Sequence, residues 1–171
     1  MRHDILENID VVGRKLTPTL ITGGLVIFGI LPLHIPGYAP VVPAFALMAV
    51  YYWTLHRPDL LSVTAIFLLG FLYDLLTGGP MGMQTLILLS ACWLTRLGRR
   101  FFQIRSFHIV WFGFTVMAAS MTILQWLFMS ISMGAPISPK TGVFAYFLTI
   151  ALYPLFGWVF FHVQQVLPRT T

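Results

Sequence analysis

Charge is scarce in this 171-residue sequence. Only 9% of its residues are charged, whereas a typical soluble domain carries about 25%. Acidic residues are the scarcest, because three of the five stand within the first ten positions and only Asp59 and Asp74 follow. General acid–base catalysis needs at least two convergent titratable groups, and Asp74 is the only acid inside an apolar segment. Acid–base catalysis within the apolar part of the chain is therefore not expected.

Cysteine is nearly absent as well. The single Cys92 lies in an apolar segment, so no intramolecular disulfide can form, and the side chain is expected to serve packing. The sequence has no metal-ligand spacing, phosphate-binding glycine loop or nucleophile motif. We therefore predict no enzymatic activity, no cofactor and no metal. The basic residues stand in short segments between apolar runs, as membrane orientation requires, so we expect no nucleic-acid partner.

Apolar residues, in contrast, are abundant. They make up 58% of the chain, and the mean hydropathy is +0.86, which indicates an integral membrane protein. Each helical crossing of a bilayer core about 30 Å thick needs roughly 20 apolar residues. We therefore predict one all-α, polytopic transmembrane domain over residues 1–171. Its six or so spans are expected at about 17–33, 41–55, 60–77, 83–97, 107–133 and 143–163.

The N-terminal residues 1–16 are predicted to form a cytoplasmic amphipathic segment. Apolar residues recur there at spacings of three and four, with acids on another face. The segment either lies on the membrane surface or docks a cytoplasmic partner. It is too acidic for a cleavable signal peptide and lacks the apolar core of one, so we expect the first span to be an uncleaved anchor.

The distribution of basic residues predicts the orientation. Nine of the ten Lys and Arg residues fall on one side of the predicted spans, and Lys140 alone falls on the other. By the positive-inside rule, both termini face the cytoplasm. The same side holds Arg96, Arg99, Arg100 and Arg105 in a predicted loop. Anionic lipids attract each such side chain by about 1 kcal/mol, and we hypothesise that Arg99 and Arg100 also contact a filament or an enzyme.

Both remaining acids lie in the segment 56–84. A turn of Arg57, Pro58 and Asp59 precedes the apolar run. Asp59 stands near the expected N-cap position of the next helix, where a carboxylate can accept hydrogen bonds from free backbone N–H groups. We therefore expect Asp59 to cap that helix.

Asp74 lies near the other end of the same run. A tight turn follows it, formed by Gly78, Gly79, Pro80, Met81 and Gly82. A carboxylate at the bilayer centre costs on the order of 2.5–3.5 kcal/mol, so it needs a partner, water or a position near the interface. The side chain either bonds to the exposed amides of the glycine turn, or forms a proton or ion site, or makes a polar contact with a partner helix.

These motifs resemble a known family. The succession VYYWTLHRPDLL, GFLYDLLTGGPMGMQTL and a basic loop is similar to the rod shape-determining protein MreD of bacteria, and the resemblance covers nearly the whole chain. It implies a multi-pass protein of the inner (cytoplasmic) membrane. It also implies a fold similar to the substrate-binding component of energy-coupling-factor vitamin transporters, although likeness of fold does not settle function.

The resemblance further implies a non-enzymatic scaffold or adaptor of the cell-elongation machinery, which builds lateral peptidoglycan. The implied partners are MreC above all, the MreB filament, RodA with its class B penicillin-binding transpeptidase, and membrane lipids. The candidate contact residues are Arg57, Pro58, Asp59, Asp74, Gly78, Gly79, Pro80, Gly82, Arg99 and Arg100. The alternative is a membrane subunit of a transporter that binds a small molecule or a lipid. Such a subunit needs more polar residues converging from several helices than Asp74, Gln84 and Gln125 supply.

Overall fold

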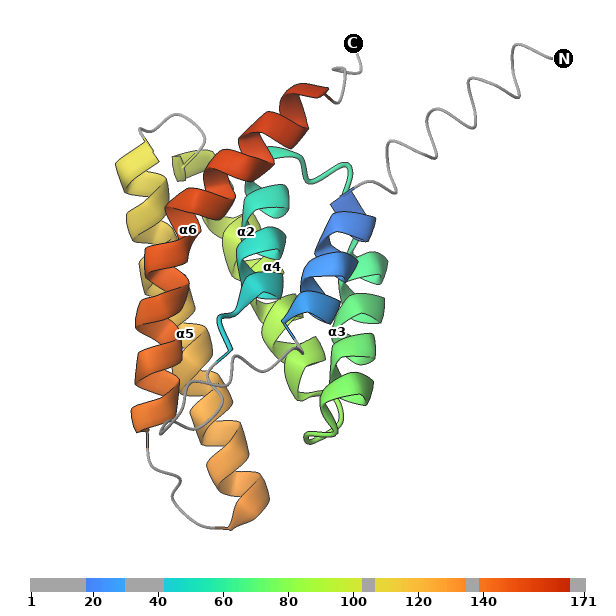
Figure 1. Cartoon of the computed structure of the whole chain (residues 1–171), viewed down its shortest axis with the longest axis vertical. Coiled ribbons are helices and arrows are strands. Elements are labelled where there is room, and N and C mark those ends of the chain that lie inside the picture. Colours follow the sequence, from blue (N-terminus) through green and yellow to red (C-terminus); the bar gives the residue numbers. More distant parts are fainter. Residues whose placement is uncertain (1–17, 30–41, 103–106, 135–138, 167–171) are drawn as a thin grey trace, which may run out of the picture.

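The structure is a computed structural model that describes residues 18–29, 42–102, 107–134 and 139–166. Within these ranges it contains helices and no strand, which confirms the all-α prediction. The predicted amphipathic segment 1–16 lies outside the described residues. Successive helices run in opposite directions along the long axis (Figure 1). They are Pro18–Phe28, α2 (Phe45–His56), α3 (Val63–Thr77), α4 (Met83–Phe102), α5 (Phe107–Met133) and α6 (Lys140–Val166).

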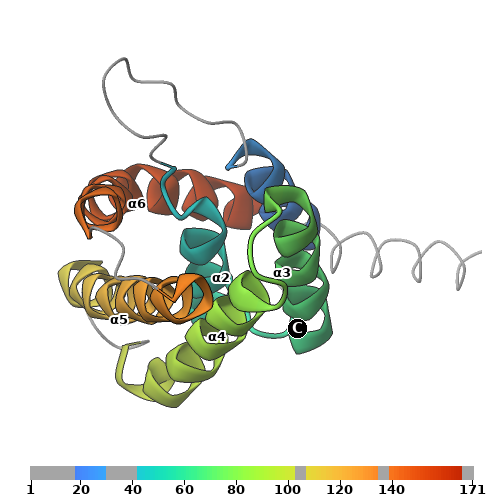
Figure 2. The same ribbon diagram turned by 90° about the horizontal axis from the view of Figure 1, so that it is seen from below.

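The helix α2 lies at the centre of the bundle, with the other helices around it (Figure 2). All its side chains from Phe45 to Leu55 are buried, as expected for a helix that is apolar on every face. Its Tyr51 ring packs against Phe114 of α5 and Tyr153 of α6, with centroids 5.3 and 6.0 Å away. The Tyr51 hydroxyl donates to the carbonyl of Val110 at 3.0 Å. A central helix thus ties α5 and α6 to the rest of the bundle.

Several helices differ from their predicted limits. α2 begins at Phe45 rather than at residue 41, and α3 begins at Val63 rather than at residue 60. α4 continues to Phe102, beyond the predicted end at residue 97. The stretch from Gly98 to Phe102, which was predicted as a loop, is therefore helical. Arginine and leucine are good helix formers, so one glycine is not enough to end the helix there.

The last helix passes through a proline. α6 is continuous from Lys140 to Val166 with Pro154 inside it, and it bends along its length (Figure 1), as the proline predicts. Proline has no N–H, so the carbonyl of Ile150 lacks its helical donor. The indole Nε1–H of Trp111 in α5 donates to this carbonyl at 3.3 Å. A neighbouring helix thus satisfies the free carbonyl, as apolar surroundings require.

The helices α3 and α4 pack more extensively than any other pair of labelled helices. Their closest approach is at Gly70, where a Cβ atom would lie only 2.6 Å from the Cα atom of Thr85. No side chain fits in that space, so the backbones of the two helices touch. Asp74 follows Gly70 by one helical turn and therefore lies on the same face of α3.

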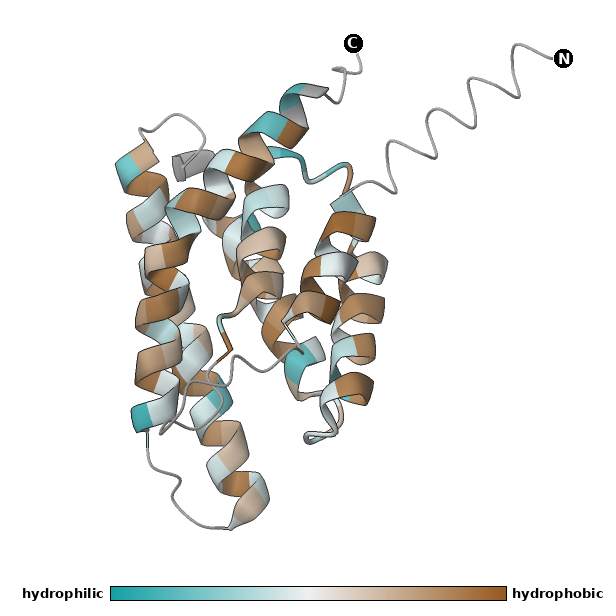
Figure 3. Ribbon diagram, viewed as in Figure 1, coloured by the Kyte–Doolittle hydropathy of each residue, from teal (hydrophilic) through white to brown (hydrophobic). Residues whose placement is uncertain are grey.

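Large apolar side chains cover the outside of the bundle. Examples are Leu68 and Leu75 on α3, Phe112 on α5 and Trp158 on α6, each more than half exposed. In Figure 3 hydrophobic colour runs along much of the length of the helices, and hydrophilic colour lies mainly near their ends. Soluble monomers rarely expose apolar patches of this extent, whereas a lipid-facing surface consists of them.

Two described helices are long and apolar enough to cross a membrane, namely α5 and the part Lys140–Val163 of α6. The others are shorter or less apolar. α2 and α3 have 12 and 15 residues, which gives ~18 and ~22 Å at ~1.5 Å per residue, less than the bilayer core. By length and composition, the structure supports two of the predicted spans.

Candidate functional site

Asp74 is buried between α3 and α4, with 2% of its surface exposed. Its Oδ1 atom accepts a hydrogen bond from the backbone N–H of Gln84 at 2.8 Å. Its Oδ2 atom accepts from the N–H of Gly82 at 3.1 Å, the N–H of Thr85 at 3.2 Å and the hydroxyl of Thr85 at 2.8 Å. Four donors therefore converge on two oxygens, which suits a carboxylate that only accepts.

These donors belong to the start of α4. The carbonyl of Gly82 accepts the first helical bond, from the N–H of Leu86 at 2.9 Å, so Gly82 occupies the N-cap position. An N-cap side chain normally accepts bonds from the free amides of the first turn, but glycine has no side chain. Asp74 supplies the missing oxygens from the neighbouring helix. Its carboxylate also lies at the positive end of the α4 dipole.

The turn between the two helices depends on two glycines. Gly78 ends α3 in the left-handed conformation, with φ of 64°, and its N–H donates to the backbone carbonyl of Asp74 at 3.2 Å. This is the usual glycine end of a helix. Gly82 also has a positive φ, 88°, and the N–H of Met83 donates to the carbonyl of Pro80 at 3.2 Å. The side chain and backbone of Asp74 thus bond to both ends of this turn. We call α3, the turn and α4 together the α3–α4 hairpin (residues 63–102).

The Arg57-Pro58-Asp59 turn lies at the opposite end of α3. The N–H of Leu60 donates to the carbonyl of Arg57 at 3.1 Å, and Asp59 is exposed. The prediction that Asp59 caps the helix is wrong. The N-cap is Ser62, whose hydroxyl accepts from the N–H of Ala65 at 3.1 Å, and because α3 begins at Val63, Asp59 lies too far upstream to cap it.

Arg99 connects α4 to the end of α2. Its Nε atom donates to the carbonyl of Leu55 at 3.2 Å. This carbonyl belongs to the last turn of α2, where cationic groups are favourable because of the helix dipole. Arg100 also lies in α4, but its side chain is outside the described part. The N-terminus of α4 is thus held by Asp74 from α3, and its C-terminal part holds α2 through Arg99.

A small polar cavity lies beside the α3–α4 hairpin. Its volume is about 70 Å³, and its polar lining residues are Tyr73, Gln84, Thr122 and Gln125. Pockets for small molecules measure about 300–1,000 Å³, so this cavity has room only for water. Among the described residues, no group of three His, Cys, Asp or Glu side chains is placed to hold a metal ion.

The comparison with known protein families identifies the chain. The family model of the rod shape-determining protein MreD matches residues 11–166. This chain belongs to the MreD family. A curated relative, the rod shape-determining protein MreD of Haemophilus influenzae, is 23% identical over 132 residues, which cover 76% of this chain and 78% of the relative. An uncharacterised protein of Rickettsia prowazekii is 26% identical over 110 residues, or 64% of this chain and 62% of that protein.

Membership of the MreD family supports a membrane protein of the bacterial cell envelope with a role in rod shape determination. The apolar helices of the structure are consistent with that location. No solved structure matches the chain. The expected likeness to the substrate-binding component of energy-coupling-factor transporters is therefore unsupported.

The structure brings only some of the candidate residues together. Asp74 and the turn that contains Gly78, Gly79, Pro80 and Gly82 form one unit with α4. Of the alternatives for Asp74, bonding to the glycine turn agrees with its bond to Gly82, whereas its other bonds go to Gln84 and Thr85 of α4. Arg57, Pro58 and Asp59 lie at the other end of α3. Sequence reasoning missed Thr85 as a donor to Asp74. Thr85 stands three residues after the N-cap Gly82, and the backbone N–H at that position is one that normally donates to a capping oxygen. Sequence reasoning also missed the bond from Arg99 to α2, which no local pattern signals.

Proposed function

We propose that this chain is a non-enzymatic membrane adaptor of the rod-shape machinery that binds MreC. Through MreC it connects to the MreB filament and to RodA with its class B penicillin-binding transpeptidase. The chain spans the inner membrane six times, with both termini in the cytoplasm. An adaptor of this kind acts through helix surfaces rather than through a reaction centre.

The observation that carries this proposal is an exposed apolar ridge on α3. Phe67, Phe71 and Leu75 follow one another at intervals of four residues, and their exposed fractions are 47%, 42% and 51%. The rings of Phe67 and Phe71 are stacked, with centroids 6.4 Å apart and planes at 5°. Residues at this spacing form the ridges with which helices pack against each other.

The hairpin fixes the direction of this ridge. Gly70 and Asp74 hold the adjoining face of α3 against α4 through backbone contact and the four carboxylate bonds. A rigid support lowers the entropic cost of binding, because the contact surface is already ordered before a partner helix arrives. We therefore assign the MreC contact to the ridge Phe67–Phe71–Leu75 and a supporting role to Asp74.

The proposed orientation has support from the described basic residues. Arg57 lies between α2 and α3, and Arg96, Arg99 and Arg100 lie in the C-terminal part of α4. Because successive helices alternate in direction, these two places lie at the same end of the bundle (Figure 1). Lys140 begins α6 at the other end. The short helices α2 and α3 then require local thinning of the bilayer or flanking side chains that reach the interface.

Photo-crosslinking in living cells tests the partner. A photoreactive amino acid at Phe71 is expected to crosslink to MreC. The same amino acid at Phe112, which is 67% exposed on α5, is the matched control and is expected to give no such product. The proposal fails if Phe71 yields no MreC product, or if both positions yield it equally.

The transporter-subunit alternative finds less support. The described polar groups Tyr73, Gln84 and Gln125 do lie around one cavity, but its volume of about 70 Å³ is far below that of a small-molecule pocket. A purified sample that bound a vitamin-like molecule with nanomolar affinity, while MreC never co-purified, would reverse this preference.

A further inference from the structure

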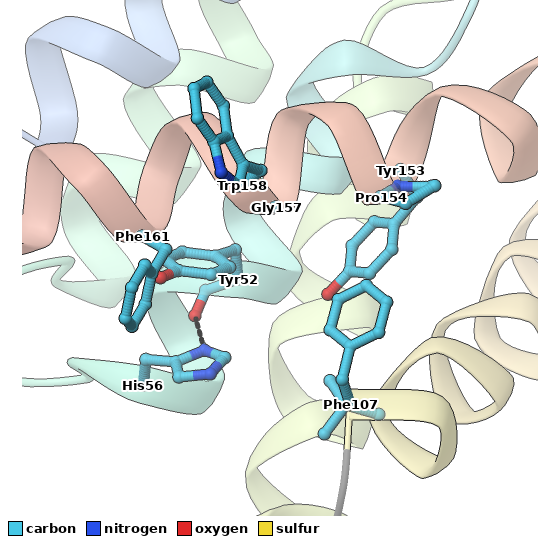
Figure 4. Close-up of a pocket in the computed structure, with 9 residues that line it drawn as sticks. Tyr52, His56, Phe107, Tyr153, Pro154, Gly157, Trp158 and Phe161 are labelled. Atoms are coloured by element: carbon cyan, nitrogen blue, oxygen red, sulfur yellow. Dashed lines mark hydrogen bonds between the residues drawn. The ribbon is translucent and has the colours of Figure 1, made fainter.

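An open groove of about 500 Å³ lies on the outside of the bundle between α2, α5 and α6. Its lining is mainly aromatic, from Tyr52, Phe107, Tyr153, Trp158 and Phe161. Figure 4 shows the rings of Tyr52 and Phe161 beside His56, with Tyr153 and Phe107 facing each other farther along. The groove is therefore mainly apolar, and it is open on the outside of the bundle.

The groove owes its depth to Pro154 and Gly157 of α6, which also line it. Gly157 has no side chain to fill the space. A Cβ atom there would meet Phe107 at 3.8 Å, an ordinary contact, so a methyl group fits and a larger side chain would occupy the groove. A large side chain at position 157 is therefore expected to fill the groove without moving α6.

One end of the groove lies at the C-terminal end of α2. His56, the last residue of α2, lines it, and its Nδ1 atom donates to the carbonyl of Tyr52 at 3.0 Å. Its ring stacks on that of Tyr52 at a centroid distance of 4.3 Å. Arg57 follows directly, and Arg99 is bonded to the carbonyl of Leu55. Arg57 and Arg99 thus both adjoin the C-terminal end of α2, next to the groove residue His56, and the adjoining turn carries the carboxylate of Asp59.

We propose that this groove binds one anionic phospholipid, with an acyl chain along the aromatic rings and the phosphate beside Arg57 and Arg99. Basic pockets between membrane helices bind anionic headgroups in this way. The volume favours a chain over a partner helix. One helical turn, ~5.4 Å long and ~10 Å wide, already occupies roughly 400 Å³, so the groove holds about one turn and not a transmembrane helix.

Native mass spectrometry of the purified chain, reconstituted in nanodiscs of equal phosphatidylglycerol and phosphatidylcholine, tests the site. The wild-type chain is expected to retain one phosphatidylglycerol. Gly157→Phe is expected to lower that retention at least tenfold. Gly157→Ala, which fits, and Val116→Phe, which fills a separate groove of about 580 Å³ between α4 and α5, are expected to keep it. Unfolding temperatures confirm that each variant is folded.

The headgroup is tested with a pair of equal charge changes. Arg57→Gln is expected to reduce the preference for phosphatidylglycerol over phosphatidylcholine about fivefold, the effect of one basic side chain near an anionic lipid. Lys140→Gln, at the other end of the bundle, is expected to leave it unchanged. Equal retention of the two lipids, or full retention by Gly157→Phe, overturns the proposal. If Gly157→Phe retains its lipid but loses a co-purifying membrane protein, the groove is a docking site for a partner helix instead.

Discussion

The carboxylate of Asp74 accepts a 2.8 Å hydrogen bond from the hydroxyl of Thr85, which lies on the next helix. This bond joins two positions that the sequence separates by a turn of glycines and a proline. Together with three backbone amides of α4, it uses both oxygens of the acid. The burial of Asp74 is thus explained by a structural need of α4, which begins with a glycine and has no cap of its own.

The first prediction concerns this cap. In Asp74→Asn, one carboxylate oxygen becomes an NH₂ group that faces N–H donors, so at least one bond is lost. An unsatisfied buried donor costs about 1–3 kcal/mol, and Asp74→Leu, which removes every acceptor, is expected to cost more. Thermal unfolding of the purified chain in detergent measures both. If the Asp74→Asn variant unfolds at the wild-type temperature, the bonds to the replaced carboxylate oxygen do not stabilise the fold.

A second prediction concerns the contact between Gly70 and Thr85. Gly70→Ala would place a Cβ atom 2.6 Å from a backbone atom, which forces α3 and α4 apart. Overpacking of this kind costs about 1–3 kcal/mol. Gly24→Ala is the matched control, because no atom lies within 4 Å of its added Cβ and alanine favours the helix. A Gly70→Ala variant as stable as Gly24→Ala contradicts the close packing of the hairpin.

A third prediction links Trp111 to Pro154. Trp111→Phe removes the donor to the carbonyl of Ile150 and is expected to destabilise the chain by about 1–3 kcal/mol. Pro154→Ala restores a backbone N–H for the same carbonyl. The double variant is therefore expected to recover stability, with a coupling of about 0.5–3 kcal/mol in a double-mutant cycle. Additive effects of the two substitutions would show that the indole bond is unimportant.

The parts of the fold that were predictable are those with local signals. Apolar composition and glycine–proline turns indicated the helices, and the acid beside a glycine turn indicated a bond to a turn amide as one of three alternatives. Asp59 was misassigned because two cap-type residues, Asp59 and Ser62, precede α3, and only the position of the first helical bond distinguishes them. The helical extension of α4 through Arg99 was missed because basic residues suit both a loop and a helix end.

Other features depend on contacts between helices that are distant in sequence. The bond from Arg99 to Leu55 joins two helices across 44 positions, and the bond from Trp111 to Ile150 joins two across 39 positions. The spacing of residues within one helix does not predict hydrogen bonds between helices that are distant in sequence. The apolar groove beside His56 was likewise invisible, because its walls come from three helices.

The proposed topology gives a fourth prediction. In a Cys92→Ser background, a cysteine at exposed Asp59 and one at exposed Thr141 report on opposite ends of the bundle. A membrane-impermeant maleimide is expected to label the Thr141→Cys chain in intact spheroplasts. The Asp59→Cys chain is expected to react only after permeabilisation. Reaction of both in intact spheroplasts, or the reverse pattern, contradicts the orientation.

The α3 ridge is the surface that we propose binds MreC. The most direct test is the amount of MreC that co-purifies per chain when Phe67, Phe71 and Leu75 are all replaced by alanine. The matched control replaces Phe112, Val116 and Ile123, which are similarly exposed on α5. The α3 variant is expected to co-purify with at least tenfold less MreC at an unchanged unfolding temperature, while the α5 variant keeps its MreC. Equal MreC recovery with the two variants would contradict the proposal.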